Sequence, residues 1–355
     1  MGLPCGTHNY TYAQDMAIMR TKTHWALLIA LLVLVFTAPL YWGDYWLGVA
    51  NLIGITVIAA IGLNILLGYC GQLSIGHAGF IAVGAYTTAV LTNVLELPFL
   101  VGLICAGLMA GFIGLIFGIP SLKVKGFYLA IATIAAQFII IWVIVHIDAV
   151  IGMELTAGAY GLDVPFVKIG GLVFDTPLKM YYLIMAITVI MGLFALNITR
   201  TRVGRAFVAV RDNDLAAEVM GVNLFYYKLL AFFIGCSFAG VAGSLFAHYY
   251  NFIGFEHFRL HESVWYLGMI VIGGMGSPLG AVLGTVFVTG LDVLSDNIAP
   301  ILSATFPFLP MNLVMPVRMI AFAIVIIVFL IYEPRGLAHR WRIFKASYRL
   351  WPYAY

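Results

Sequence analysis

Ten apolar runs limit the folds open to this chain more than any other feature of its sequence. Eight of them are close to the length of about 20 residues that carries a helix across a bilayer, and they occupy residues 25–42, 46–70, 78–95, 98–119, 126–147, 180–198, 229–250 and 313–332. Two shorter runs, 263–275 and 279–294, are interrupted by glycine. The sequence therefore predicts an all-α polytopic membrane protein with about ten spans, or eight or nine if the short pair is re-entrant.

The composition excludes the common soluble classes. Of the 355 residues, 63% are apolar and 9% are charged, whereas a soluble domain is about half apolar and about a quarter charged. The net charge is only +3 and there is no long basic stripe, so we expect no nucleic-acid partner. The four cysteines are scattered and form no CxxC pair, which argues against a disulfide framework or a zinc site.

The distribution of charge predicts the orientation of the chain. If the N-terminus is cytoplasmic and ten spans follow, the cytoplasmic segments hold 14 of the 18 lysines and arginines, and the outer segments hold ten of the 15 acidic residues. This distribution obeys the positive-inside rule and places both termini in the cytoplasm. The chain then divides into an N-terminal arm (1–24), a transmembrane domain (25–333) with an outer loop (148–179) and a cytoplasmic loop (199–228), and a basic tail (334–355).

The sequence lacks the motifs of ATP hydrolysis, ion-coupled transport and metal binding. There is no G-x-x-x-x-G-K-[ST] phosphate loop, so the chain is not expected to hydrolyse ATP by that route. No acidic residue lies at the middle of an apolar run, which argues against a self-sufficient secondary transporter coupled to protons or sodium. His257 and His261 are spaced to share a helix face beside Glu256 and Glu262, but we interpret them as part of an exposed outer loop rather than as metal ligands. We therefore expect no catalytic residue, metal site or cofactor.

The cytoplasmic loop predicts two short helices. Residues 203–211 suit the first, and Asp214 is the expected N-cap of a second that runs over Leu215–Met220 and ends at Gly221. Four alanines in this loop have small side chains and predict a surface that another protein could approach closely. They are Ala206, Ala209, Ala216 and Ala217. Two interpretations remain open, namely an amphipathic helix anchored to anionic lipid or a coupling element that inserts into a cytosolic motor. The candidate coupling residues are Gly204, Arg205, Ala206, Arg211, Ala217, Glu218 and Gly221.

Glycine interrupts two of the apolar regions, 68–84 and 268–284. An interrupted span exposes backbone polar groups, which a membrane tolerates only where they face protein or water. Such segments are pointers to a translocation path. The alternative is close packing of helices through small residues. The candidate path residues are Gly71, Gln72, Ser74, His77, Gly273 and Gly274.

Short motifs in a fixed order give the chain a family resemblance. In sequence order they begin at Gly71-Gln72-Leu73-Ser74, Gly126-Phe127-Tyr128, Leu155-Thr156-Ala157-Gly158, Gly204-Arg205-Ala206-Phe207, Phe238-Ala239-Gly240, Gly273-Gly274-Met275-Gly276 and Pro334-Arg335-Gly336. Together they span roughly residues 48–337 and resemble the LivM-type permeases, which are membrane subunits of branched-chain amino acid ABC importers. Family members usually carry Thr-Gly-Gly where this chain has Thr156-Ala157-Gly158, and the family also serves urea, amides and aromatic acids.

The resemblance implies partners and a location. A sister permease of the LivH type would complete the path, two cytosolic ABC ATPase subunits would contact residues 199–223, and an extracytoplasmic substrate-binding protein would deliver the substrate. The chain would then be a non-catalytic transport subunit in the bacterial inner membrane, and ATP hydrolysis would reside in its partners.

Overall fold

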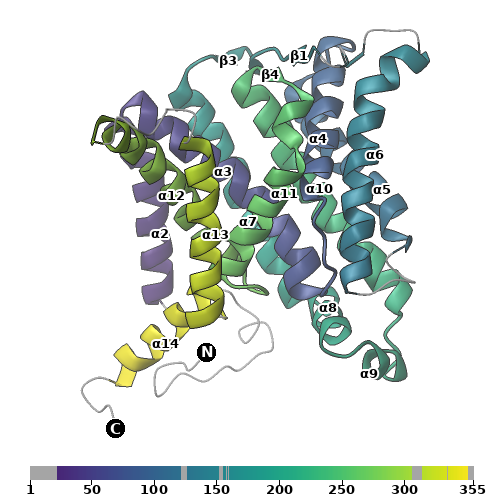
Figure 1. Ribbon diagram of the computed structural model, residues 1–355, viewed down its shortest axis with the longest axis vertical. Coiled ribbons are helices and arrows are strands. Elements are labelled where there is room, and N and C mark those ends of the chain that lie inside the picture. Colours follow the sequence, from purple (N-terminus) through teal and green to yellow (C-terminus); the bar gives the residue numbers. More distant parts are fainter. Residues whose placement is uncertain are drawn as a thin grey trace.

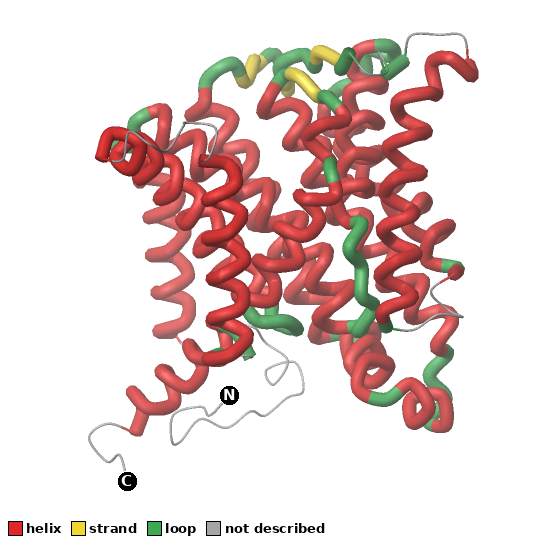
Figure 2. The backbone as a smooth tube through the Cα atoms, viewed as in Figure 1, coloured by secondary structure: helices red, strands yellow, loops and turns green. Residues whose placement is uncertain are grey.

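The structure, a computed structural model, describes residues 22–120, 126–151, 155–156, 158, 160–305, 314–333 and 335–350. Helices dominate this part of the chain (Figures 1 and 2). They are α2 (Lys22–Thr37), α3 (Asp44–Leu63), α4 (His77–Asn93), α5 (Phe99–Gly118), α6 (Phe127–Ile151), α7 (Pro177–Arg200), α8 (Arg202–Asp212), α9 (Asp214–Val219), α10 (Leu224–Tyr250), α11 (Leu260–Gly273), α12 (Pro278–Thr305), α13 (Val314–Tyr332) and α14 (Leu337–Leu350).

Short elements complete the description. Two 3-10 turns are η1 (Ala38–Leu40) and η4 (Phe255–Phe258), and a π-helical segment, η2 (Asn64–Tyr69), continues α3. Strand β1 (Leu162–Asp163) pairs antiparallel with β4 (Phe252–Ile253), and β2 (Val167–Ile169) pairs antiparallel with β3 (Leu172–Phe174).

Each of the ten apolar runs coincides with a helix, so the all-α polytopic class is confirmed. Among the described residues, six helices are long and apolar enough to cross a membrane, or seven if the bent pair α13 and α14 forms one span. Helices α2, α4 and α11 have 16, 17 and 14 residues, which is shorter than the usual span of about 20 residues. The count of ten spans therefore stays a prediction.

The two ends of the bundle differ. Helices α8, α9 and α14 lie at one end, and the four short strands lie at the other (Figure 1). The loop 199–228 and the described part of the loop 148–179 are thus on opposite ends, as the charge distribution requires. After the predicted orientation, we call the end with α8, α9 and α14 the inner end and the end with the strands the outer end.

Helix α10 lies at the centre of the larger hydrophobic core, which contains buried side chains of α3, α4, α5, α7 and α10. Its contacts with its neighbours are made through glycine. A β-carbon at Gly243 would overlap the carbonyl oxygen of Ile81 on α4, and one at Gly240 would overlap the carbonyl oxygen of Ala106 on α5. Gly240 and Gly243 are therefore packing residues, because backbone meets backbone at these positions.

A second, smaller core lies beside the first. Helices α11, α12 and α13 supply its buried residues, which are Trp265, Met269, Ile272, Val288 and Phe322. Ile270 of α11 and Ala281 of α12 belong instead to the larger core. The two bodies are therefore joined near the end of α11 and the start of α12.

Replacing Gly243 with alanine should strongly destabilise the protein, because a backbone carbonyl cannot move aside as a flexible side chain can. We expect a loss near the upper end of the cost of overpacking, about 3 kcal/mol, measured as a lower melting temperature in detergent. A β-carbon added at Gly192 on α7 would meet no other atom within 4 Å, so Gly192→Ala is the matched control. Equal melting temperatures for the two variants would contradict this account of the α4–α10 contact.

Candidate functional site

Two helices break inside the bundle and the breaks lie together. The first break comprises the π-helical segment η2 and residues 70–76, which run as irregular chain between the helices until α4 begins at His77 (Figure 2). The second break covers residues 274–277 between α11 and α12, where Gly274 has φ +109° and Gly276 has φ +74°. The first break overlaps the glycine-interrupted region 68–84 identified in the sequence, and the second lies within the region 268–284.

Asn64 bridges the two breaks with its side-chain amide. Its Nδ2 donates to the carbonyl oxygen of Ser277 (2.8 Å), and its Oδ1 accepts from the backbone N–H of Gly276 (2.9 Å). The side chain is buried, so the amide satisfies two backbone groups that the break would otherwise leave unpaired. Gly68 is required beside it, because a β-carbon there would overlap Asn64 Oδ1 and the Gly276 nitrogen. Sequence reasoning missed Asn64, although an amide inside an apolar run was a visible signal.

Arg211 of α8 connects the cytoplasmic loop to both breaks. Its Nη1 donates to the carbonyl oxygen of Gly68 (2.8 Å), while its Nε and Nη2 donate to Asp212 Oδ1 (2.9 and 2.8 Å). A β-carbon at Gly71, where φ is +73°, would lie 2.9 Å from Arg211 Cγ, and one at Gly276 would lie 3.0 Å from Nη1. The structure thus brings a candidate coupling residue, Arg211, against the candidate path residue Gly71. We call Asn64, Gly68, Gly71, Arg211 and Gly276 the inner junction.

The loop has the two expected short helices but a different cap. Asn213, with extended backbone, is the N-cap of α9, and its Oδ1 accepts from the N–H of Ala216 (3.1 Å). The prediction that Asp214 is the N-cap was wrong, because both residues are good caps and Asp214 instead forms an ion pair with Lys228 of α10 (2.9 Å).

Gly221 ends α9 as predicted. It has φ +84°, and the N–H of Val222 donates to the carbonyl oxygen of Ala217 (3.0 Å) while the N–H of Gly221 donates to that of Glu218 (2.9 Å). These two bonds form a Schellman motif, which glycine favours because of the left-handed backbone.

The surface of the loop differs from the expected one. Ala206 and Ala217 are buried, as is Gly204, so the prediction of an accessible surface was wrong for these two alanines, whereas Ala216 is exposed and Ala209 is half-buried. The buried residues occupy the helix faces that pack on the protein's own core, as Phe207 does. Arg205 and Glu218 are exposed, and Arg205 Nη1 donates to the carbonyl oxygen of Arg200 (3.2 Å). Three large apolar side chains of α9 and its end are strongly exposed, namely Leu215 (72%), Val219 (86%) and Met220 (83%).

Further path candidates are buried in the first break and at the start of α4. Gln72, Ser74 and His77 all have low exposure, and His77 Nε2 lies 2.9 Å from the carbonyl oxygen of Ala59. In the described part of the chain, three polar atoms have no hydrogen-bond partner here: Gln72 Oε1, Ser74 Oγ and His77 Nδ1. Such atoms call for a specific explanation, since buried polar groups are nearly always paired. Of the remaining candidates, Gly273 is the last residue of α11 and Gly274 is the first residue of the second break.

A buried network that sequence reasoning missed fixes the start of α4. Ser263 Oγ accepts from the N–H of Ala78 (2.8 Å) and donates to Gln137 Oε1 (2.8 Å), and Gln137 Nε2 donates to the carbonyl oxygen of Phe258 (2.8 Å). Thr133 Oγ1 accepts from the N–H of Ile75 (3.0 Å). Helices α4, α6 and α11 are therefore held together around the irregular segment.

A cavity of about 480 Å³ lies between α3, α4, α10, η4, α11, α12 and α13. We call it the outer cavity, because η4 closely follows β4 at the outer end. Its walls are largely apolar, and its polar lining includes Glu256, His257, Arg259, His261, Glu262 and Asp292. His257 and His261 are exposed, as we interpreted them, and residues between 256 and 262 also line the cavity. The two histidines do not share a helix face, because η4 ends at Phe258 and α11 begins at Leu260.

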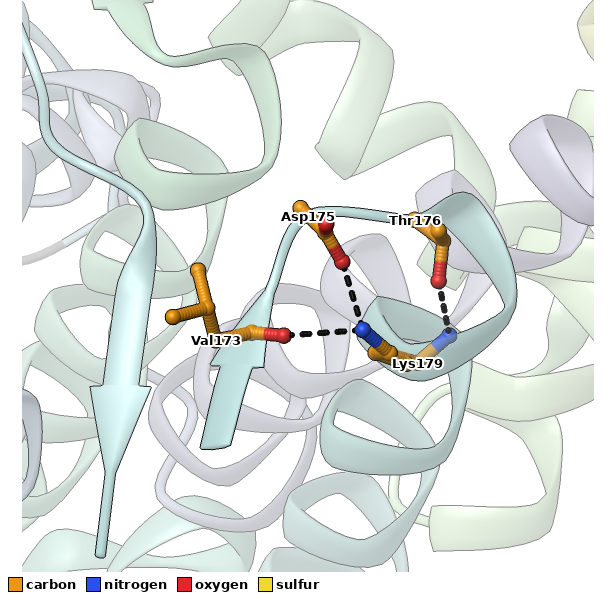
Figure 3. Close-up of polar contacts among 4 residues, drawn as sticks. All are labelled: Val173, Asp175, Thr176 and Lys179. Atoms are coloured by element: carbon orange, nitrogen blue, oxygen red, sulfur yellow. Dashed lines mark hydrogen bonds and ion pairs between the residues drawn. The ribbon is translucent and has the colours of Figure 1, made fainter. Parts of the chain in front are cut away.

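A hairpin at the outer end leads into α7. Lys179 Nζ donates to Asp175 Oδ1 (2.6 Å) and to the carbonyl oxygen of Val173 (3.1 Å), and Thr176 Oγ1 accepts from the N–H of Lys179 (3.4 Å) (Figure 3). The hydrogen bond from Lys179 lowers the pKa of the Asp175 carboxyl. Both side chains are about half exposed, so the pair orients the hairpin on α7 while adding little stability.

Known proteins that are similar to this chain are permease components of transport systems. The family described as branched-chain amino acid transport system, permease component, matches residues 45–330. The high-affinity branched-chain amino acid transport system permease protein LivM of Escherichia coli is 34% identical over 283 residues, which cover 73% of this chain and 65% of that relative. A probable branched-chain amino acid transport permease protein LivM from Methanocaldococcus jannaschii is 25% identical over 80% of this chain and 90% of its own length.

A more distant relative matches over a shorter stretch. The autoinducer 2 import system permease protein LsrC of Enterobacter sp. is 34% identical over 31% of this chain and 34% of its own length. The chain spans 65% of the length of the E. coli and Salmonella relatives. No solved structure matches it.

Proposed function

Because this chain belongs to the LivM-type branched-chain amino acid transport permeases, we propose that it is the membrane-spanning permease subunit of an ATP-driven importer of branched-chain amino acids. A sister permease of the LivH type completes the path, two cytosolic ABC ATPase subunits supply the energy, and an extracytoplasmic binding protein delivers the substrate. The complex lies in a bacterial inner membrane with the inner end in the cytoplasm. The chain itself carries out no hydrolysis.

The contact between Arg211 and the first break is the observation that carries this proposal. Arg211 belongs to the loop that would meet the ATPases, and its guanidinium holds the carbonyl oxygen of Gly68 in the break. A displacement of α8 is therefore transmitted directly to η2, and through Asn64 to the second break. In this mechanism ATP-driven closure of the ATPase pair moves α8 and α9, and the path opens alternately to the binding protein and to the cytosol.

The outer cavity is suited to an apolar amino acid. Its apolar walls, among them Ile55, Ile81 and Met269, accommodate a hydrocarbon side chain, while its charged lining meets the polar ends of a zwitterion. Selectivity can reside in the binding protein, so the permease needs only a weak site here.

Reconstitution tests the proposed function. We expect vesicles that contain both permeases and both ATPase subunits to accumulate labelled leucine when ATP is inside and binding protein is outside. Competition with urea and with simple amides distinguishes branched-chain amino acids from the other solutes of such permeases. Uptake by this chain alone, without ATP, would contradict the proposal and indicate a self-sufficient carrier.

The apolar end of α9 should contribute to ATPase binding. Truncating Leu215, Val219 and Met220 to alanine removes apolar surface that is exposed in the isolated subunit, and we expect a loss of about 3 kcal/mol, or roughly a hundredfold in affinity. The measurement is the amount of ATPase subunit that purifies with the tagged permease. The matched control truncates Ile104, Leu108 and Ile116, which are exposed on α5. Equal recovery from both triple variants would exclude α9 as a docking element.

A further inference from the structure

Helix α14 lies outside the region matched by the family and carries charge of one sign. Its 14 residues include three arginines and one lysine and no acidic residue. Leu337, Trp341 and Phe344 follow the spacing i, i+4, i+7, so they share one helix face. Trp341 and Phe344 are exposed (46% and 61%). Leu337 packs on the second core, whereas no residue of the described chain buries Trp341 and Phe344, so the helix combines a basic surface with an exposed apolar end of this stripe.

The position of α14 places it where the membrane surface is expected. It begins just after α13 ends at Tyr332 and is bent by 45° from the axis of α13. It lies at the inner end of the bundle and extends away from the other helices (Figure 1). Aromatic and basic side chains that directly follow a span are typical of the boundary between headgroups and hydrocarbon.

The cations of α14 differ in what they contact. Arg340 forms an ion pair with Glu333, and the ammonium of Lys345 lies 5.8 Å from the centroid of the Trp341 ring. Arg342 is exposed, as are Lys345 and Trp341. Arg342 and Lys345 thus place positive charge next to the apolar stripe, which is the arrangement that binds an anionic bilayer surface.

The first turn of α14 packs against the second break. A β-carbon at Gly274 would lie 3.0 Å from the carbonyl oxygen of Arg335 and 3.4 Å from Ala338 Cβ. A β-carbon at Gly336, where φ is +74°, would lie 2.5 Å from Gly274 Cα. Ala338 is buried at this contact. A contact that fixes the position of α14 therefore also fixes the second break, which Asn64 joins to the first break.

We propose that α14 binds anionic phospholipid at the cytoplasmic leaflet, with Trp341 and Phe344 inserted among the headgroups and Arg342 and Lys345 paired with lipid phosphates. This contact anchors the second break to the membrane surface. A lipid surface fits better than a protein partner, because α13 leaves the bilayer immediately before α14 and the charge complements an anionic leaflet. The inference is independent of the substrate and of the ATPase contact.

An environment-sensitive fluorophore on the intact complex tests the proposal. In a background in which the four cysteines are replaced, the label is attached at Phe344→Cys or, as the control position, at the exposed Ala346→Cys. The complex is placed in nanodiscs of phosphatidylcholine with increasing phosphatidylglycerol. We expect the label at position 344 to enter an apolar environment as phosphatidylglycerol rises, and the label at position 346 to stay in water.

Charge variants make the test quantitative. Each cation near an anionic surface contributes about fivefold in binding, so Arg342→Gln with Lys345→Gln should shift the phosphatidylglycerol dependence by roughly 25-fold. The double variant Lys168→Gln and Lys179→Gln removes two exposed cations from the outer end and should not shift it. Native mass spectrometry of the complex with its cysteines intact should show fewer retained phosphatidylglycerol molecules for the α14 variant than for the outer-end variant.

Two results would overturn the proposal. One is a label at position 344 that stays in water at every phosphatidylglycerol content, together with equal lipid retention by the two double variants. The other is burial of the label only when the ATPase subunits are added, which would assign α14 to a protein contact. Neither readout requires transport, so failure here is separate from failure of the proposed function.

Discussion

Replacing Arg211 with glutamine is expected to abolish most ATP-driven uptake while leaving the permease folded and its ATPase partners bound. The guanidinium donates to the carbonyl oxygen of Gly68 in the first break, and a hydrogen bond from a charged group contributes about 1.5–3 kcal/mol. Loss of that energy from the link between α8 and η2 corresponds to roughly a ten- to hundredfold fall in coupled uptake. The ATPase rate should persist and lose its dependence on the binding protein.

The control for this variant is Arg202→Gln. Arg202 begins α8 and is exposed, so the substitution changes the charge of the loop without touching the break. Uptake and ATPase activity are measured on the same vesicles for both variants. Unchanged uptake in Arg211→Gln, or a parallel loss of uptake and of folded protein, would contradict a role for Arg211 in coupling.

Replacing Asn64 with leucine should be the most damaging single substitution at the inner junction. Leucine is close to asparagine in size but leaves the N–H of Gly276 and the carbonyl oxygen of Ser277 without their partners. A buried polar group that loses its partner costs about 1–3 kcal/mol, so two such groups cost about 2–6 kcal/mol. We expect a lower melting temperature in detergent and loss of uptake.

Asn51 on the same helix provides the comparison. It is buried, and its Nδ2 donates to the carbonyl oxygen of Pro177 (3.2 Å) on α7. Asn51→Leu therefore removes one hydrogen bond and leaves the two breaks connected. A variant at Asn51 as damaging to uptake as the variant at Asn64 would show that the effect arises from general destabilisation and not from separation of the breaks.

Sequence reasoning predicted the local features of this protein well. Apolar length located each long helix, glycine located both breaks, and Gly221 marked the end of α9, because each of these depends on residues within one or two turns. The cap of α9 was misplaced by one residue, since Asn213 and Asp214 are equivalent by local rules. Only the ion pair of Asp214 with Lys228, 14 residues further on, distinguishes them.

The inner junction and the cavity could not be predicted from the sequence, because both depend on residues that are far apart in the chain. Asn64 is joined to Gly276, 212 residues away, and Arg211 is joined to Gly68, 143 residues away. A single sequence holds no signal for such pairs, because each residue type has many possible partners in a helical bundle. The burial of Ala206 and Ala217 could not be predicted for a similar reason. A small residue allows a close contact with the protein's own core as readily as a close contact with a partner.

The backbone contacts of α10 have a mechanical consequence. Helices α4, α5 and α10 meet through Gly84, Gly240 and Gly243, and surfaces in such contact can neither slide nor rotate without atomic overlap. Within the described residues, the second core around Trp265 and Phe322 has no such lock to α10. We therefore expect displacement within the molecule to cost least between the two cores. We expect the inner junction to stay fixed while α11 to α13 move, and the volume of the outer cavity to change with that movement.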